Sequence, residues 1–294
     1  MMLVRTRGMQ RLIGLIPSEL EKKIDVTFDD LRGEVEPLIG AKVEHVNWFS
    51  TYRVHHRVAE HLRVGRTFLA GDAGHIHSPT GGQGMNTGIG DAINLGWKLA
   101  DVMRGRASPV ILDTYEAERL PFAKRLVATT DRVFEAIISG GFKGELVRNW
   151  LAPAVINIAT RLPATKHQAF RTVSQTAIGY RDSVLSEGDA GLHGGDRLPW
   201  IKPHDGDEDN FKPLQSLDWQ VHVYGRPEVG LDEACAKLRV ALHVVPWSNG
   251  ARDVGLLRDA AYLVRPDGYI ALAAHADCAI KLKGYTTRLG LNFA

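Results

Sequence analysis

Residues 66–100 read RTFLAGDAGHIHSPTGGQGMNTGIGDAINLGWKLA, and this stretch decides how the chain is interpreted. Its first apolar residues predict a strand over about Arg66–Ala70. Glycine is concentrated here, because the 26 residues from Gly71 to Gly96 hold eight of the chain's 30 glycines. A long helix is predicted from about Asn86 to Arg104. Its apolar face would consist of Ile89, Ile93, Gly96, Ala100 and Met103.

Three glycines fall inside this predicted helix, at Gly88, Gly90 and Gly96. Each costs about 0.5–1 kcal/mol relative to alanine in a helix interior, so a gain elsewhere must offset them. Close approach of the helix backbone to something flat or bulky is the usual gain. We infer such an approach here.

The cluster Gly81-Gly82-Gln83-Gly84 opens the helix, so unpaired backbone N–H groups and the positive end of the helix dipole face whatever lies above it. Asp72 follows the strand, which we expect to be parallel to its neighbours, and ligands bind at the carboxyl ends of such strands. A carboxylate there can accept hydrogen bonds from sugar-alcohol hydroxyls. The alternative is an N-cap or loop aspartate satisfied by nearby backbone, and the glycine cluster favours the ligand.

The segment resembles the second flavin-binding motif of the FAD-dependent aromatic hydroxylases, which are single-component flavoprotein monooxygenases. The resemblance is carried by GDAGHIHSPTGGQGMNTGIGDAINLGWKLA, with FSTYRVHHRVAEHLRVGRTFLA before it and LDTYEAERLPFAKRLVATTDR after it, roughly residues 45–135. The C-terminal third resembles the thioredoxin-like appendage of the phenol-hydroxylase and polyketide-hydroxylase branch, including its LVRPDGYIA ending.

This resemblance implies a function for individual residues. Asp72 would bind the ribityl chain of the flavin, and Pro79 would lie beside the isoalloxazine ring and the substrate. The amides of the first helical turn would bind the pyrimidine edge of the flavin, which is negative when reduced. Tyr52 and Arg53 lie on a strand that would border the substrate, although an exposed strand face is the alternative for each. The implied cofactor-binding residues are Gly71, Asp72, Pro79, Gly81, Gly82, Gln83, Gly84, Met85 and Asn86.

The resemblance also implies an activity, although it assigns no catalytic side chain. NAD(P)H would reduce FAD, O2 would form a flavin hydroperoxide, and an aromatic, phenolic or polyketide substrate would be hydroxylated. The competing interpretation is a non-catalytic module that forms a homodimer or complements a separate N-terminal FAD-binding chain.

Two motifs of the family are not found in the sequence. One is the strand–GxGxxG–helix that holds the ADP half of FAD, and the other is a DG-containing motif in the middle of the domain. We therefore expect the chain to be the C-terminal part of a longer hydroxylase. We also expect this polypeptide by itself to bind FAD weakly or not at all.

The expected fold class is α/β with three regions. Residues 1–58 would be a remnant of the substrate-domain sheet and helix, with a helix over Thr27–Leu38 and Asp25 as its N-cap. Residues 59–180 would be the second half of a Rossmann-like FAD/NAD(P)-binding domain, with further helices over about Ile111–Ser139 and 146–162. Residues 181–294 would be a linker and the thioredoxin-like domain.

The C-terminal region predicts the order β-α-β-α-β-β-α from Trp219 onward, with a helix over Leu231–Leu242. RPDG at residues 265–268 predicts the turn of a hairpin. Where a thioredoxin would carry CxxC, the sequence has Tyr-Gly-Arg-Pro at 224–227, so we expect no disulfide exchange.

Composition excludes several classes. Hydrophobic residues are 44% and charged residues 24%, which is typical of a globular protein, and the net charge of +2 gives no basis for nucleic-acid binding. No run approaches 18 apolar residues, so no membrane span is expected, and the N-terminus has no signal-peptide pattern. We expect a cytoplasmic protein.

Two charged groups of residues have ordinary interpretations. His75 and His77 lack acidic or cysteine partners at ligand spacing, so we expect packing or solvated histidines and no metal. Glu116, Glu118 and Arg119 have helical spacing for an ion pair and would anchor their helix.

Overall fold

The computed structural model describes residues 2–6, 9–17, 19–20, 22–52, 55–76, 83–138, 170–172, 174–203 and 209–293. The chain divides into two compact units, Met1–Val54 and His55–Ala294. The helix expected over residues 146–162 lies outside the described residues, as do Arg53, His77, Pro79, Gly81 and Gly82.

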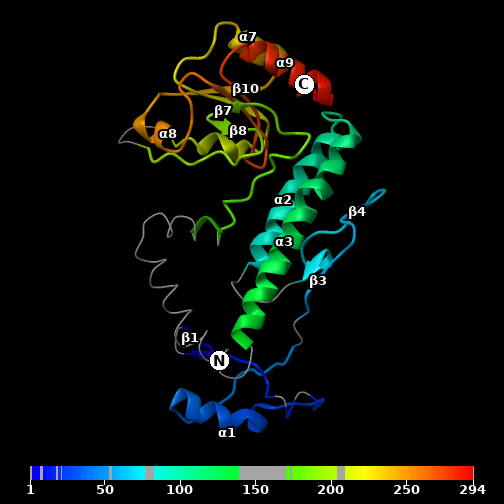
Figure 1. Ribbon diagram of the computed structural model, residues 1–294, viewed down its shortest axis with the longest axis vertical. Helices are drawn as coiled ribbons and strands as arrows, with labels where there is room; N and C mark the ends of the chain where they lie inside the picture. Colours follow the sequence, from blue (N-terminus) through cyan, green and yellow to red (C-terminus); the bar gives the residue numbers. More distant parts are fainter. Residues whose placement is uncertain are drawn as a thin grey trace. The chain divides into compact units, whose positions relative to one another are not determined.

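The first unit contains a hairpin and one helix (Figure 1). Strands β1 (Met2–Thr6) and β2 (Met9–Ile13) pair in antiparallel fashion, and α1 covers Phe28–Ile39, as predicted. The N-cap of α1 is Thr27 instead of Asp25, because the Thr27 backbone N–H and hydroxyl both donate to the Asp30 carboxylate, at 2.8 and 3.0 Å. Gly40, with φ of +64°, ends the helix.

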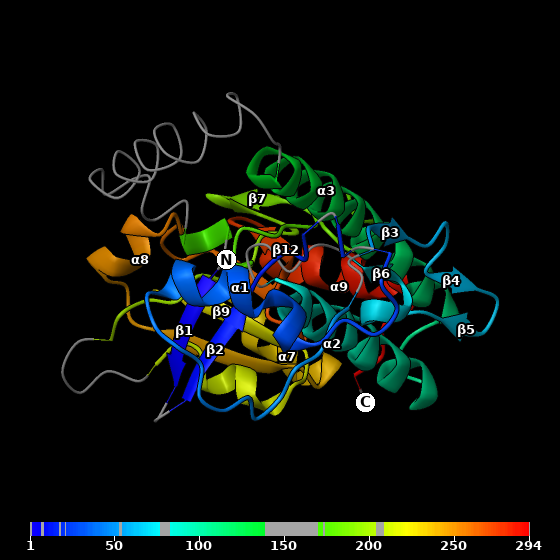
Figure 2. The ribbon, with the colours of Figure 1, turned by 90° about the horizontal axis from the view of Figure 1, so that it is seen from below.

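The second unit begins with short antiparallel strands. β3 (Arg57–Val58) pairs with β6 (His75–Ile76), and β4 (Arg63–Val64) pairs with β5 (Thr67–Phe68). β3 and β6 lie beside α3 (Asp113–Ile138; Figure 2). The expected parallel strand before Asp72 is therefore wrong. Only two residues separate β4 from β5, whereas a parallel pair needs a crossover of a dozen or more residues.

Two long helices follow the short strands. α2 covers Gly84–Met103, the 3-10 turn η2 covers Pro109–Leu112, and α3 runs beside α2 (Figure 1). α2 buries its polar side, while Ile89 and Ile93 are half exposed and Met103 is 85% exposed. The face predicted to be apolar thus points away from the rest of the described unit. The buried residues of α2 are Thr87, Asp91, Asn94, Trp97, Lys98 and Asp101.

The C-terminal region contains a four-stranded sheet in the order β10-β9-β11-β12. β9 (Gln220–Tyr224) is parallel to β10 (Ala241–Val245) and antiparallel to β11 (Ala261–Val264), which forms a hairpin with β12 (Ile270–Ala274). The helices are α7 (Leu231–Leu238), α8 (Asn249–Asp253) and α9 (Cys278–Leu289), and a small hairpin of β7 (Asp189–Ala190) and β8 (Leu192–His193) precedes the sheet. The predicted element order is confirmed, although α7 ends four residues early because Arg239 adopts a φ of +56°.

The apolar core of this region lies on both faces of the sheet, because successive strand residues point to opposite sides. Val221, Val223 and Leu263 face a cluster that includes α7 and α9, and these helices cover that face (Figure 1). Tyr262 and Val264 face a second cluster, which includes Ala251 of α8. The buried residues of both clusters are at most 8% exposed, so both faces of the sheet are covered.

Candidate functional site

The two segments expected to contact the flavin lie next to each other. Residues Gly71–Ala73 form a 3-10 turn, η1, in which Gly71 adopts a φ of +60°. The Asp72 side chain is exposed, and no hydrogen bond or ion pair joins its carboxylate to another described residue. An unpaired carboxylate at this turn is available to a ligand.

The N-terminus of α2 offers the complementary groups. Because the helix begins at Gly84, the N–H groups of Gly84, Met85 and Asn86 have no acceptor within it. The first helical N–H to find one is that of Thr87, which donates to the carbonyl of Gln83 at 3.0 Å. Met85 is 74% exposed, so this end of the helix is open within the described unit.

The glycines inside α2 approach other parts of this chain. A Cβ at Gly88 would lie 3.3 Å from the Cα of Gly71, and one at Gly90 would lie 3.2 Å from Nη2 of Arg119. Nothing lies within 4 Å of a Cβ at Gly96. The inferred close approach is therefore correct for two of the three glycines, with the η1 backbone and a guanidinium as the neighbours.

A buried cluster, which we call the Asp91 cluster, joins η1 to both helices. It consists of His75, Asp91, Arg119 and Tyr180, all less than 10% exposed. Asp91 Oδ2 accepts from the Gly71 N–H at 3.0 Å and lies 2.6 Å from Nε2 of His75. Asp91 Oδ1 accepts from Nε of Arg119 at 2.6 Å. Burial alone would raise the pKa of Asp91, but His75 and Arg119 outweigh it and hold the pKa below its usual value.

A second buried cluster, the Glu118 cluster, joins the helices to the C-terminal sheet. Both oxygens of Glu118 accept from Arg265, at 2.8 and 3.0 Å, and Oε2 also accepts from Nζ of Lys98 at 2.8 Å. Asp267 accepts from Arg265 at 2.6 Å and from the Trp97 indole at 3.0 Å. The Asn94 amide and the Ser183 hydroxyl also donate to Glu118, each at 2.7 Å.

The charges of the Glu118 cluster determine how its members titrate. Burial alone would raise the pKa of Glu118, but Arg265 and Lys98 hold it well below its usual range. Burial and the positive charge of Arg265, which shares the same carboxylate, together lower the pKa of Lys98 to about 8, although Glu118 acts in the opposite direction. Glu118 is therefore ionised at neutral pH and neutralises the buried cations around it.

The structure changes the interpretation of the acidic helix segment. The spacing of Glu116, Glu118 and Arg119 predicts a pair within the helix, yet each side chain bonds to another element. Glu116 accepts from the backbone N–H groups of Leu62 and Arg63, at 2.6 and 2.9 Å. Anchoring is confirmed, but the partners lie elsewhere in the sequence.

The remaining predicted residues divide between those described and those outside the described part. Tyr52 is 65% exposed in the first unit. His75 is buried, as expected of a packing histidine, but it does have an acidic partner, because its Nε2 lies 2.6 Å from Oδ2 of Asp91. Among the described residues, no group of three or more His, Cys, Asp or Glu could hold a metal ion. Within the same residues, no helix has the length and apolar character to cross a bilayer.

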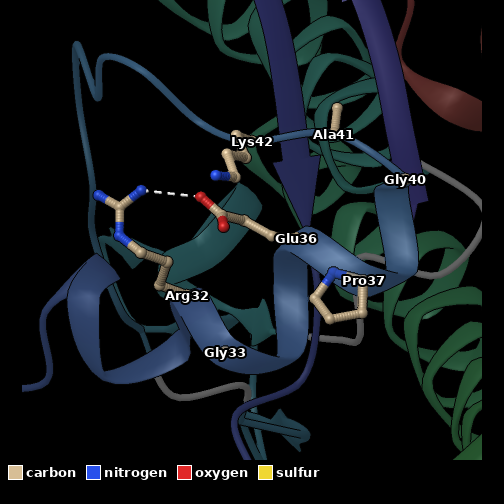
Figure 3. A pocket seen from close by; sticks show the side chains of 7 residues that line it. All are labelled: Arg32, Gly33, Glu36, Pro37, Gly40, Ala41 and Lys42. Carbon is tan, nitrogen blue, oxygen red and sulfur yellow. Dashed lines mark hydrogen bonds and ion pairs between the residues drawn. The ribbon is translucent and has the colours of Figure 1, made fainter.

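A shallow pocket lies on the first unit, at the C-terminal end of α1 (Figure 3). Its lining includes Arg32, Glu36 and Lys42. The Arg32 guanidinium donates to the Glu36 carboxylate at 2.9 Å and to the carbonyl of Val43 at 2.8 Å, so its charge is already paired. We assign no ligand to this pocket.

Comparison with known families and structures gives the context of these residues. The FAD binding domain family matches residues 3–130. A solved anhydrotetracycline hydroxylase from Streptomyces rimosus is 30% identical, with a TM-score of 0.70 over 92% of this chain and 54% of that one.

Two curated relatives extend the comparison. An uncharacterized aromatic compound monooxygenase from Bacillus subtilis is 41% identical over 276 residues, covering 89% of this chain and 52% of the relative. Pentachlorophenol 4-monooxygenase from Sphingobium chlorophenolicum is 43% identical over 162 residues, covering 54% of this chain and 28% of the relative. This chain thus spans about half or less of the length of these relatives. It resembles the FAD-dependent aromatic and polyketide hydroxylases, as the sequence predicts.

Proposed function

We propose that this chain is part of a FAD-dependent monooxygenase that hydroxylates an aromatic, phenolic or polyketide substrate with NAD(P)H and O2. The observation that carries the proposal is that η1, with the unpartnered carboxylate of Asp72, lies beside the open N-terminus of α2. Hydroxyl groups and an electron-rich ring edge are the ligands that these groups would accept. The match to the FAD binding domain family supports this cofactor, and the similarity to an aromatic compound monooxygenase and an anhydrotetracycline hydroxylase supports the reaction class.

The segment from Gly71 to Asn86 would hold one half of FAD. Asp72 would accept hydrogen bonds from the ribityl hydroxyls, and the amides of Gly84, Met85 and Asn86 would donate to the pyrimidine edge. Pro79, Gly81 and Gly82 would border the ring, and Gln83 would position the first turn through its carbonyl, which accepts from Thr87. When bound and reduced by NAD(P)H, FAD would supply the activation of O2 that side chains cannot provide.

The substrate assignment rests on the relatives and on two side chains. The related enzymes are named for phenolic, aromatic and tetracycline substrates. We propose that Tyr52 and Arg53 contact such a substrate, with Arg53 binding a phenolate or carboxylate. Replacing Arg53 with Lys would keep the charge and lose bidentate geometry, so it should raise the Kd of a phenolic ligand titrated onto the chain.

The C-terminal region would be a thioredoxin-like domain without redox chemistry. Its element order and its parallel β9–β10 pair support this proposal. Burial raises the pKa of both the Cys235 and Cys278 thiols to about 11, so neither would be a thiolate at neutral pH. Two reduced, buried thiols also fit a cytoplasmic location.

The second candidate function is a complementing module. The exposed apolar side of α2, with Ile89 and Ile93, would be covered by the FAD-domain segment that binds the ADP half of the cofactor. A homodimer that covers this face is the alternative. In either case this chain alone would bind FAD weakly.

A flavin titration tests the proposed site. FMN keeps the isoalloxazine ring and the ribityl chain but lacks adenosine, so this chain should bind FMN and FAD with affinities within a few-fold of each other. The shifts of backbone amide NMR signals on adding millimolar FMN should centre on Gly84–Asn86. Asp72→Ala should raise the Kd for FMN obtained from these shifts at least tenfold. Binding of FAD that is orders of magnitude tighter than FMN would contradict the expectation of weak binding. No FMN-dependent shift in the first turn of α2 would overturn the proposed site.

A further inference from the structure

We propose that Asp91 is a positioning residue that holds the η1 turn and the start of α2 in one fixed arrangement, so that both present their groups to the same flavin. This inference rests on the proposed function of Asp72 and the α2 amides. Asp91 would not touch the flavin itself, because its side chain is buried beneath η1.

Asp91 binds the η1 turn directly. The Asp91 carboxylate accepts from the N–H of Gly71, the residue directly before Asp72, at 3.0 Å. The same oxygen lies 2.6 Å from His75, which follows η1 by two residues. Asp91 therefore binds the chain on both sides of Asp72, from a position two turns into α2.

Arg119 connects Asp91 to the first turn of α2. Arg119 donates from Nε to Asp91 at 2.6 Å and from Nη2 to the carbonyl of Thr87 at 3.2 Å. Its third bond, from Nη1, goes to the Tyr180 hydroxyl at 2.9 Å. Thr87 belongs to the first turn of α2, so the Asp91–Arg119 pair connects that turn to η1.

The backbones of η1 and α2 also lie in close contact. Gly71 and Gly88 approach so closely that a Cβ on Gly88 would meet the Cα of Gly71 at 3.3 Å. That distance is too tight for an unmoved neighbour, so a methyl group here must displace η1. Gly96, farther along α2, has nothing within 4 Å and lies in the same helix, which makes it a matched control.

The two arms of the test use different perturbations of the same geometry. Asp91→Asn removes the charge and one acceptor oxygen, whereas Gly88→Ala shifts η1 without changing any charged group. The matched control for the first is Asp101→Asn, because Asp101 is a buried aspartate of α2 that accepts from the Trp219 indole at 2.8 Å, away from η1. The control for the second is Gly96→Ala.

The readouts separate positioning from general stability. In the ligand-free chain, amide hydrogen exchange at Gly71 should accelerate at least tenfold in Asp91→Asn and stay unchanged in Asp101→Asn. FMN affinity, measured well below each variant's unfolding temperature, should fall at least tenfold in Asp91→Asn and several-fold in Gly88→Ala. Both controls should keep it within twofold.

Each outcome has one meaning. If the controls lose as much FMN affinity as Asp91→Asn and Gly88→Ala, then Asp91 acts only on stability and the inference is wrong. If Asp91→Asn fails to fold, Gly88→Ala decides the question by the same comparison. If exchange at Gly71 accelerates while Asp72→Ala leaves FMN binding intact, the bond between Asp91 and η1 stands and the proposed flavin site fails.

Discussion

Two buried regions of this chain are held together in opposite ways. The Asp91 and Glu118 clusters fill the space beside α2 with charges and hydrogen bonds, whereas the C-terminal sheet is packed with apolar side chains such as Val223 and Leu263. α2 even exposes Ile89 and Ile93 while it buries Asp91 and Lys98. The packing of α2 against its neighbours therefore depends on hydrogen-bond geometry and charge, whereas the packing of the sheet depends on side-chain volume.

The two kinds of buried contact contribute differently to stability. Buried ion pairs add little net stability over apolar packing, yet removing one partner is costly, because an uncompensated charge is left inside. Apolar packing tolerates changes of shape more easily. We infer that the sheet provides most of the stability, while the charged clusters fix how α2 lies against its neighbours.

The largest expected effect comes from breaking the Glu118 cluster. Glu118→Gln leaves Lys98 and Arg265 buried without their shared carboxylate, so the free energy of unfolding should fall by roughly 3–5 kcal/mol. Urea denaturation followed by circular dichroism measures it. The control is Glu233→Gln, an exposed residue of α7, which should change the value by less than about 0.5 kcal/mol. A loss below 1 kcal/mol in Glu118→Gln would show that water reaches the cluster.

The next effect comes from the sheet. Leu263→Ala removes a side chain that is 2% exposed, and the cavity should lower the free energy of unfolding by roughly 2–5 kcal/mol. Leu263→Met keeps the volume and should cost less than about 1.5 kcal/mol. If Met is as damaging as Ala, the sheet is as sensitive to shape as the helix clusters are, and the comparison fails.

Acid should act on the charged region first. The pKa of Glu118 is lowered in the folded chain, so below the unfolded value of 4.5 the unfolded state binds a proton that the folded state does not. The stabilisation is complete above that pH and is lost as the pH falls, by at most about 1.4 kcal/mol per pH unit for this one carboxylate. A plot of the free energy of unfolding against pH, taken from denaturation curves between pH 3 and 6, should therefore be flatter in Glu118→Gln than in the unmodified chain. Equal slopes would exclude Glu118 as the group responsible.

The smallest effect is expected on the exposed side of α2. Ile93→Ser alters a side chain that is 51% exposed, so stability should change by no more than about 0.5 kcal/mol. The thermal midpoint of the purified chain measures this change. A loss comparable to that of Leu263→Ala would mean that this face is already covered in solution, as a homodimer would require.

The sequence predicts elements whose signals are local. Helix α1, the long helix α2 and the order of the C-terminal elements follow from periodicity and turn residues. The parallel strand before Asp72 is predicted wrongly, since parallel pairing depends on distant strands that local pattern cannot reveal.

The charged clusters could not be predicted, because their partners are far apart in the chain. Glu118 and Arg265 are 147 residues apart, and Asp91 and Arg119 are 28 apart. A signal was nevertheless present. Asp91, Asn94, Lys98 and Asp101 recur at helical spacing opposite the apolar stripe of α2, and such a stripe is consistent with either a solvated or a buried face. Only the structure shows that the polar stripe of α2 is its buried face.

The hairpin turn at Asp267 links the C-terminal sheet to the two long helices. Its carboxylate accepts from the Trp97 indole of α2, and the neighbouring Arg265 holds Glu118 of α3. A gene that lost the C-terminal region would encode helices with a carboxylate and a lysine arranged for an arginine that no longer exists. Exchange of either segment between relatives should therefore succeed only where the charges of both segments agree.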